Sequence, residues 1–221
     1  MGYIRYYLRE AGMQNYWNRR FMNEGRIWGD SPSRTALQAM ALFRKEGVQK
    51  ILIPGSGYGR HSDYFAVEGF AVHGIEVSDV AAGLCVFSNF LVRYFRGSVL
   101  DMPFSDDLYD AVYCFNLLHL FRAGDRKAFI GKCAAQVRPG GVFFFTVFSE
   151  QEPTCGKGQK VEENTYESKP GRPTHYFTHE DMRDHFSALD VLETGLVEDE
   201  ENHGNEGPHV HLLRYIAARK P

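Results

Sequence analysis

Three features are scarce in this sequence, and each shortage excludes a class of protein. Basic residues show no excess, because 25 Lys and Arg face 28 Asp and Glu among the 221 residues and leave a net charge of −3. Such a chain has no surplus charge to neutralise a phosphate backbone, so we expect no nucleic-acid partner. Long apolar runs are also missing. The strongest one, residues 142–149, is far shorter than the roughly 20 residues that cross a bilayer as a helix, so we expect no membrane partner.

Cysteine is the third scarce feature. The four cysteines stand far apart and form no C-x-x-C pair, so the pattern contains neither a disulfide framework nor a metal-binding pair. The first residues carry charges at Arg5, Arg9 and Glu10 and contain no apolar segment followed by a small-residue cleavage site, unlike a secretory signal. We therefore expect a cytoplasmic protein with reduced thiols.

The sequence does contain an alternation of short apolar runs with stretches of helical spacing. A hydrophobic content of 43% and a charged content of 24% are typical of a globular chain, and the length fits a single domain over residues 1–221. The alternation predicts an α/β protein with helices on both faces of a sheet. We expect seven strands, near residues 49–54, 71–75, 94–97, 109–115, 142–149, 189–197 and 209–218.

Three segments stand outside this alternation. Residues 1–30 are rich in aromatic side chains, which either join the core through an amphipathic helix or form a lid or cap over a cofactor site. Residues 150–177 are polar and contain three prolines, and we expect a long functional loop there near the active site. Residues 198–208 are acidic and predict a solvated turn between the last two strands.

A glycine-rich turn follows the first expected strand. Gly55, Gly57 and Gly59 alternate with Ser56 and Tyr58 before a helix, and such turns let a ligand approach the backbone where a side chain would clash. The third glycine comes four residues after the first, whereas a dinucleotide fingerprint needs five. This spacing argues against a nicotinamide cofactor.

Acidic and apolar residues follow the next strands in a pattern that suits a nucleoside. Glu76 ends the second expected strand, where an acid can accept hydrogen bonds from both ribose hydroxyls. After the third strand, Asp101 can accept a hydrogen bond from an exocyclic amine, and Leu100 or Met102 can pack on a purine face. The fourth strand ends at Asn116.

With these motifs in order, the chain resembles the class I S-adenosylmethionine-dependent methyltransferases over most of residues 30–220. The resemblance implies a doubly wound, mostly parallel, Rossmann-like sheet of seven strands with the last strand antiparallel. It also implies S-adenosylmethionine as cofactor and S-adenosylhomocysteine as product, with the glycine turn at the methionine part, the acid on the ribose and the Asp on the adenine. The cofactor-binding residues carried over by motif are Gly55, Ser56, Gly57, Gly59, Glu76, Val77, Leu100, Asp101, Met102 and Asn116.

One position departs from the family pattern. The family usually has an acid two residues before the first glycine, where this chain has Ile53 followed by Pro54. In that replacement the chain resembles the thiopurine branch of the family. Residues 16–33 resemble the small-molecule enzymes of the tellurite-resistance and thiopurine groups, and residues 209–220 resemble the tellurite-resistance group. The resemblance therefore implies methyl transfer to a small molecule, which can be a thiol, a chalcogen oxyanion or a small oxygen or nitrogen nucleophile.

Methyl transfer needs mainly proximity, orientation and exclusion of water, with a base only where the nucleophile must lose a proton. A soft thiolate or chalcogen anion needs little help from a base, whereas an oxygen or nitrogen nucleophile can need a histidine. The candidates for catalysis are His119, His209 and His211, and those for substrate binding are Tyr16, Trp17, His175 and Arg214.

The C-terminal histidines also raise the question of a metal site. His209 and His211 should share one face of a strand, and His203 and Glu206 lie nearby in the sequence. Because no H-x-x-x-H pattern or cysteine pair accompanies them, we expect no metal and favour a role as base or substrate ligand.

Two further functions stay open on the sequence. A non-catalytic module that kept the fold is suggested by Ile53, and a nicotinamide-dependent oxidoreductase by the glycine turn with Glu76. Residues 116–119 read Asn-Leu-Leu-His, and the absence there of an Asn-Pro-Pro-Tyr type tetrapeptide disfavours methylation of nucleic-acid bases by comparison with the family. The oligomeric state is left open.

Overall fold

The computed structural model describes residues 2–85, 91–203 and 207–221, with side chains described from residue 12 onward. A seven-stranded sheet forms its centre, in the order β3-β2-β1-β4-β5-β10-β9. The first five strands pair in parallel, and β10 is antiparallel to both β5 and β9, which confirms the expected doubly wound sheet. The strands are β1 (Lys50–Pro54), β2 (Ala71–Glu76), β3 (Val92–Arg96), β4 (Tyr109–Phe115), β5 (Val137–Phe148), β9 (Asp190–Asn202) and β10 (Pro208–Arg219).

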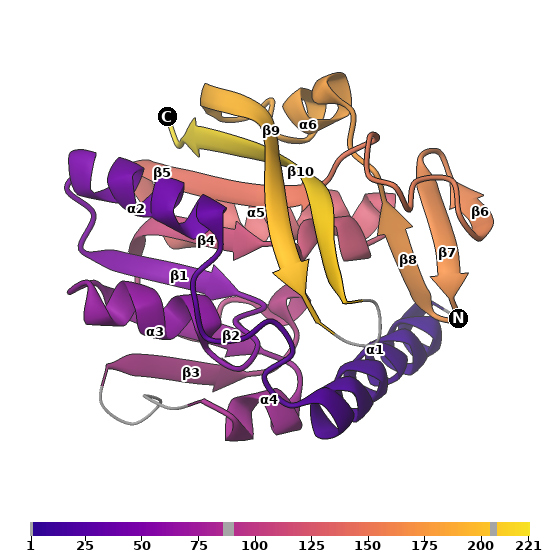
Figure 1. Ribbon diagram of the computed structural model, residues 1–221. Helices are drawn as coiled ribbons and strands as arrows, with labels where there is room; N and C mark the ends of the chain where they lie inside the picture. Colours follow the sequence, from indigo (N-terminus) through magenta and orange to yellow (C-terminus); the bar gives the residue numbers. More distant parts are fainter. Residues whose placement is uncertain (1, 86–90, 204–206) are drawn as a thin grey trace.

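Helices cover both faces of this sheet (Figure 1). Successive side chains of a strand point to opposite faces, so Leu52 packs in the cluster that includes residues of α5 (Ala123–Gln136) and α6 (His179–His185). Its neighbours Ile51 and Ile53 pack in the cluster on the other face, with residues of α2 (Arg34–Lys45) and α3 (Arg60–Val67). Strand β1 is thus buried on both sides, which explains its nearly continuous apolar run.

The aromatic N-terminal segment forms the 23-residue helix α1 (Gly2–Glu24), which packs against α4 (Asp79–Gly83). Figure 1 shows α1 beyond the arrowheads of β1, β2 and β3, at the carboxyl edge of the sheet where ligands bind in open α/β folds. The Oδ1 of Asn18 accepts a hydrogen bond of 2.7 Å from the hydroxyl of Ser78, the N-cap residue of α4. None of the described helices has the length and apolar character needed to cross a membrane.

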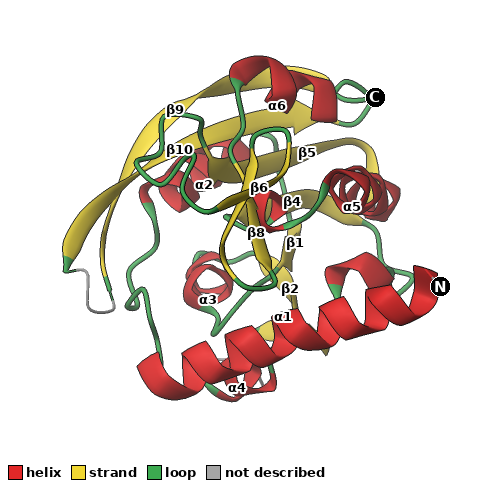
Figure 2. Cartoon of the chain, turned by 90° about the vertical axis from the view of Figure 1, so that its right-hand side faces the viewer, coloured by secondary structure: helices red, strands yellow, loops and turns green. Residues whose placement is uncertain are grey.

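The segment expected to be a long loop, residues 150–177, contains a second, three-stranded antiparallel sheet: β6 (Gln159–Glu162), β7 (Thr165–Lys169) and β8 (Arg172–His175). Asn164 and Gly171 occupy the two turns with positive φ angles. The strands were missed because polar residues fill their inward positions. Buried Thr165, for example, is hydrogen-bonded at 2.8 Å to the Nδ1 of His175 rather than packed as an apolar residue. Figure 2 shows β6 and β8 on the side where α1 lies.

The acidic segment 198–208 is also mostly strand rather than turn. Glu198 to Asn202 continue β9, and Pro208 begins β10, while residues 204–206 lie outside the described residues. Asp199 and Glu201 are buried, whereas the residues between and beside them are exposed. The strand alternation was therefore present in the sequence, but with carboxylates in the inward positions.

Candidate functional site

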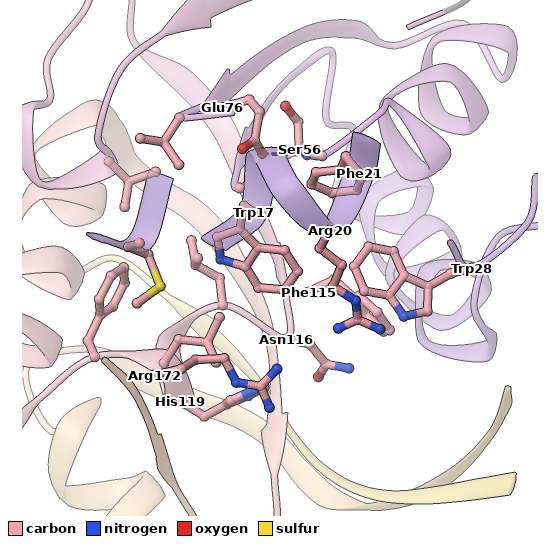
Figure 3. Close-up of a pocket in the computed structure, with 18 of the residues that line it drawn as sticks. Trp17, Arg20, Phe21, Trp28, Ser56, Glu76, Phe115, Asn116, His119 and Arg172 are labelled. Carbon is pink, nitrogen blue, oxygen red and sulfur yellow. Dashed lines mark hydrogen bonds between the residues drawn. The ribbon is translucent and has the colours of Figure 1, made fainter. Parts of the chain in front are cut away.

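A cavity of about 480 Å³ lies at the carboxyl edge of the sheet. Its walls come from α1, the glycine turn after β1, the ends of β2 and β4, and the second sheet with the β9–β10 hairpin. Figure 3 shows Glu76 and Ser56 at one end and His119 and Arg172 at the other, with Trp17 between them. Of the predicted cofactor residues, the cavity brings together Gly55, Ser56, Gly57, Glu76, Val77 and Asn116.

The glycine turn adopts backbone angles that other residues rarely reach. Gly55 and Gly57 have φ angles of 67° and 56°, in the left-handed region. A Cβ atom on Gly55 would lie 2.9 Å from the side chain of Leu117, so close packing as well as the backbone angle requires glycine there. Ile53, in the place of the family's acid, is buried in the core beside this turn and also lines the cavity.

Glu76 closes the glycine turn from the end of β2. Its Oε2 accepts a hydrogen bond of 2.8 Å from the backbone N–H of Gly57, and its Oε1 accepts one of 2.8 Å from Ser78. Burial raises the pKa of this carboxyl, while the backbone hydrogen bonds oppose the rise. Each carboxylate oxygen has a second lone pair, so the group can still accept hydrogen bonds from a ligand in the cavity.

Four predicted cofactor residues lie outside the cavity lining. Met102 and Leu100 are buried in the core cluster under α5, so they are not available to pack on a purine in this arrangement. Asp101 is exposed at the end of the short helix η1 (Val99–Asp101). The turn before it, Gly97 with Ser98 and Val99, lines the cavity instead. Gly59, the fourth, caps α3 with a φ of 93°.

Asn116 lies directly after β4 with a φ of 50°, which is unusual for a residue other than glycine. Its backbone N–H donates to the carbonyl of Thr146 at 3.1 Å, and the hydroxyl of Thr146 donates to its side-chain oxygen at 3.2 Å. These contacts with β5 hold the residue at the floor of the cavity. A left-handed residue at a strand end is typical of binding sites, where backbone strain is retained.

His119 lines the cavity but offers a donor rather than a base. The backbone N–H of Phe148 donates to its Nδ1 at 3.3 Å, and the two rings stack with centroids 4.3 Å apart. Burial holds the pKa of His119 well below its usual value, so the ring is neutral with its proton on Nε2. That N–H can donate to an acceptor molecule, whereas the lone pair on Nδ1 is already used.

The aromatic residues of the N-terminal segment serve as both core and cavity wall. Trp17, Phe21 and Trp28 form one cluster with Tyr58 of the glycine turn, in which the rings of Trp28 and Tyr58 stack at 6.1 Å. All four line the cavity. Arg20 also lines the cavity and was not predicted, although the helical spacing of residues 13, 17, 20 and 21 places these four on one face of α1.

Tyr16 does not line the cavity itself but binds Arg172, which does. Arg172 of β8 lines the cavity and donates from Nη1 to the Tyr16 hydroxyl at 3.0 Å, while its buried Nε has no hydrogen-bond partner. Although burial opposes it, the cations Arg172, Lys169 and Arg20 lower the pKa of the Tyr16 hydroxyl. The role of Arg172 in the cavity was not predicted from the sequence, because residues 150–177 have the polar pattern of a loop.

Two predicted substrate residues lie behind the cavity rather than in its lining. Arg214 is buried, donates from Nε to the carbonyl of Phe177 and pairs with Glu150 at 2.8 Å. His175 is buried between Thr165 and Asp181, with a hydrogen bond to each. Both side chains have polar atoms that bind other groups of the protein, and neither is part of the cavity lining.

The C-terminal histidines lie at the wall formed by the β9–β10 hairpin. His211 and His203 line the cavity together with Glu201, whereas His209 lies just outside the lining. His209 and His211 do share a face of β10, as their spacing predicted. Glu206 lies outside the described residues, and the acid that joins the histidines is Glu201.

Known proteins resemble this chain in sequence over its centre. Residues 52–145 match the family model described as a methyltransferase domain. An uncharacterised methyltransferase of Synechocystis sp. is 28% identical over 95 residues, which cover 43% of this chain and 45% of the relative. The match thus spans about half the length of the curated relative.

Solved structures resemble the fold over nearly the whole chain. Magnesium protoporphyrin IX methyltransferase from Synechocystis, with bound S-adenosylmethionine, has a TM-score of 0.68 at 14% identity and coverage of 96% and 97% of the two chains. A Burkholderia thailandensis 1,6-didemethyltoxoflavin N1-methyltransferase has a TM-score of 0.65 at 20% identity, covering 96% and 87%. TehB from Haemophilus influenzae has 0.64 at 14%, covering 94% and 67%.

At these identities the structures show the fold alone, and the similarity in sequence is confined to the central part of the chain. The glycine turn, the buried acid after β2 and the strand order agree with both. Residues 52–145 thus match a methyltransferase domain, and the chain has the fold of solved methyltransferase structures.

Proposed function

We propose that the protein transfers a methyl group from S-adenosylmethionine to a small-molecule acceptor. The observation that carries the proposal is a single cavity with two chemically different ends, one formed by Glu76 and the glycine turn and the other by cations and histidines (Figure 3). Its volume of about 480 Å³ lies within the range of about 300–1,000 Å³ that is usual for small ligands.

The residues present fit the cofactor at the first end. The carboxylate of Glu76 is in the lining, and its two oxygens, each already bound to one backbone N–H, have capacity left for the ribose hydroxyls. Gly57 leaves space beside the backbone for a methionine chain, since a Cβ atom there would meet only Phe21 at 3.9 Å. When bound, S-adenosylmethionine supplies an electrophilic methyl on its sulfonium.

The other end of the cavity suits a small acceptor with an anionic group. Over the whole cavity, five lining side chains carry positive charge and two carry negative charge, and one of the two acids, Glu76, belongs to the cofactor end. The Nη1 of Arg172 is held by Tyr16, and the Nε2 proton of His119 faces the same end, so together they can orient an anionic or carbonyl oxygen. The cations are Arg20, Arg60, Lys157, Lys169 and Arg172, and the acids are Glu76 and Glu201.

The chain's own contribution is orientation and exclusion of water. Trp17 and Phe21 of α1, with Trp28 from the segment that follows it, line the cavity, so nucleophile and methyl would meet in a dry site. A thiolate or oxyanion acceptor needs no base there. The four cysteines are free thiols, which supports the cytoplasm as the working compartment, and the net charge of −3 supports a small molecule over a nucleic acid.

Calorimetric titration with S-adenosylmethionine and S-adenosylhomocysteine, with NAD as control, tests the proposal. We expect stoichiometric micromolar binding of the first two and none of NAD. Because Glu76→Ala removes the carboxylate that accepts hydrogen bonds from the ribose hydroxyls, it should weaken binding roughly ten- to hundredfold. Glu180→Ala, an exposed acid of α6, is the matched control and should bind like the wild type.

The same titration separates the competing functions. Ile53 stands where the family usually has an acid beside the turn. If the protein binds neither S-adenosylmethionine nor S-adenosylhomocysteine, that result would favour a non-catalytic module. Measurable NAD affinity would favour an oxidoreductase. If binding is confirmed, formation of S-adenosylhomocysteine should be screened across thiols, chalcogen oxyanions and small hydroxy acids. Turnover with none of them would leave a binding module as the better interpretation.

A further inference from the structure

The end of the β9–β10 hairpin nearest the connection between the two strands gathers four side chains of metal-ligating type. In the antiparallel register, His209 stands opposite Glu201, and His211 is two residues further along β10. Alternation along the strands places them on one face, and His203 follows β9 on the same side. One ligand atom from each of Glu201, His203, His209 and His211 lies within 4.8 Å of the others.

Two of the histidines are oriented as metal ligands are. The Nδ1 of His209 lies 2.7 Å from the carbonyl of Gly207, which can only accept, so this nitrogen carries the proton. In the neutral ring its Nε2 therefore carries a lone pair, and that atom is buried without a hydrogen-bond partner. His211 repeats the arrangement, because its Nδ1 donates at 3.0 Å to the buried carboxylate of Glu152 and its Nε2 faces Glu201.

A histidine that binds a metal through one ring nitrogen usually donates the N–H of the other nitrogen to a carbonyl or a carboxylate. His209 and His211 both make such a hydrogen bond. Glu152 is itself fixed, since its second oxygen accepts a hydrogen bond of 2.8 Å from the backbone of Leu212. The supporting groups are thus already in place around the cluster.

The distances are close to those of a tetrahedral site. Ligands about 2.1 Å from zinc stand about 3.4 Å apart. The Nε2 atoms of His203 and His211 lie 3.0 Å and 3.7 Å from Oε2 of Glu201. Arg60 reaches the other oxygen, Oε1, at 3.4 Å, so its charge does not occupy the ligand position. An ion would replace the proton that His203 shares with Glu201.

We propose that Glu201, His203, His209 and His211 bind one zinc ion at the wall of the cavity. Three imidazoles and one carboxylate favour zinc over calcium or magnesium, which prefer sets of oxygen ligands. Four protein ligands fill a tetrahedral shell, so the ion holds the end of the hairpin against the cavity. The metal proposal does not rest on methyl transfer, although Glu201, His203 and His211 also line the cavity.

Metal content and cobalt spectroscopy test the site on tag-free protein. After incubation with zinc and dialysis, we expect one zinc ion per chain. Replacement by Co²⁺ should give the strong visible absorption of a four-coordinate nitrogen and oxygen site. His209→Gln and His211→Gln should each weaken zinc binding more than about tenfold, whereas His179→Gln, an exposed histidine of α6, should bind like the wild type.

Two outcomes overturn the proposal. One is wild-type protein that retains no zinc and shows only the weak spectrum of hydrated Co²⁺, a result that needs no variant to interpret. The other is equal zinc retention by the wild type and the two cluster variants, which would place the ion at other histidines. A rise in the unfolding midpoint with zinc, present in wild type and His179→Gln and absent in His209→Gln, would add support.

Discussion

Individual residues at the cavity are constrained by backbone angle and by space. Gly59 begins α3 with a φ of 93°, and a Cβ atom there would lie 2.7 Å from the Tyr94 hydroxyl. Tyr94 cannot easily withdraw, because its ring also lies against the backbone of Gly74. At this position, glycine is required by the fold itself, even though the residue does not line the cavity.

We therefore expect Gly59→Ala to lower the free energy of unfolding by about 1–3 kcal/mol, from the left-handed backbone angle together with the clash. Gly131→Ala is the matched control, since Gly131 is exposed in α5 and a Cβ there meets nothing within 4 Å. That change should stabilise the protein by up to about 1 kcal/mol. Urea unfolding measures both, and equal effects of the two substitutions would contradict the argument.

At the scale of elements, the cavity depends on contacts between segments that the chain brings together from a distance. Helix α1 meets α4 through Asn18 and Ser78, and it meets β8 through Tyr16 and Arg172, which are 156 residues apart. Ser78 also donates its backbone N–H to Glu76, so the position of α1 is linked to the acid expected to bind ribose.

Asn18→Ala should loosen α1 without unfolding the sheet. Loss of its hydrogen bond with Ser78 costs about 1 kcal/mol, which corresponds to about fivefold faster local opening. Hydrogen exchange followed by mass spectrometry should show faster exchange over residues 12–24 and unchanged exchange in β4 and β5. Asn15→Ala, an exposed residue of the same helix, is the control, and because alanine favours the helix its exchange should be unchanged or slower; equally fast exchange in both variants would contradict the argument.

At the scale of the whole molecule, buried histidine makes stability depend on pH. His61 is buried in contact with Phe115 and Tyr113 and accepts a hydrogen bond at Nε2 from the backbone of Ser33. Burial, aided by the charge of Arg60, holds the pKa of His61 well below 6.5. The unfolded chain takes up this proton near pH 6.5 and the folded chain does not, so this contribution is complete above pH 6.5 and is lost as the pH falls below it.

For one such group, the loss between pH 6.5 and pH 5.5 is about 1 kcal/mol. His61→Gln should remove that part of the pH dependence, whatever its effect on stability at neutral pH, and His179→Gln should keep the wild-type slope. Denaturant unfolding at several pH values measures the slopes. Equal slopes for wild type and His61→Gln would show that His61 does not titrate on unfolding.

The sequence by itself determined the order of strands and helices, the glycine turn and the acid that closes it. These features are local: apolar runs mark buried strands, left-handed turns need glycine, and Glu76 is fixed by its place at the end of β2. The strands of residues 159–175 were missed because their inward positions are polar, so the pattern lacked the apolar signal on which the prediction relies.

Only the tertiary structure decided which side chains meet in the cavity. Leu100 and Met102 could be placed after β3 from the sequence, but the packing of α5 turned them into the core. The β9–β10 register set His209 opposite Glu201, and the docking of α1 brought Arg172 to Tyr16. Contacts between distant segments depend on register and on the packing of whole faces, and neither is encoded in the spacing of neighbouring residues.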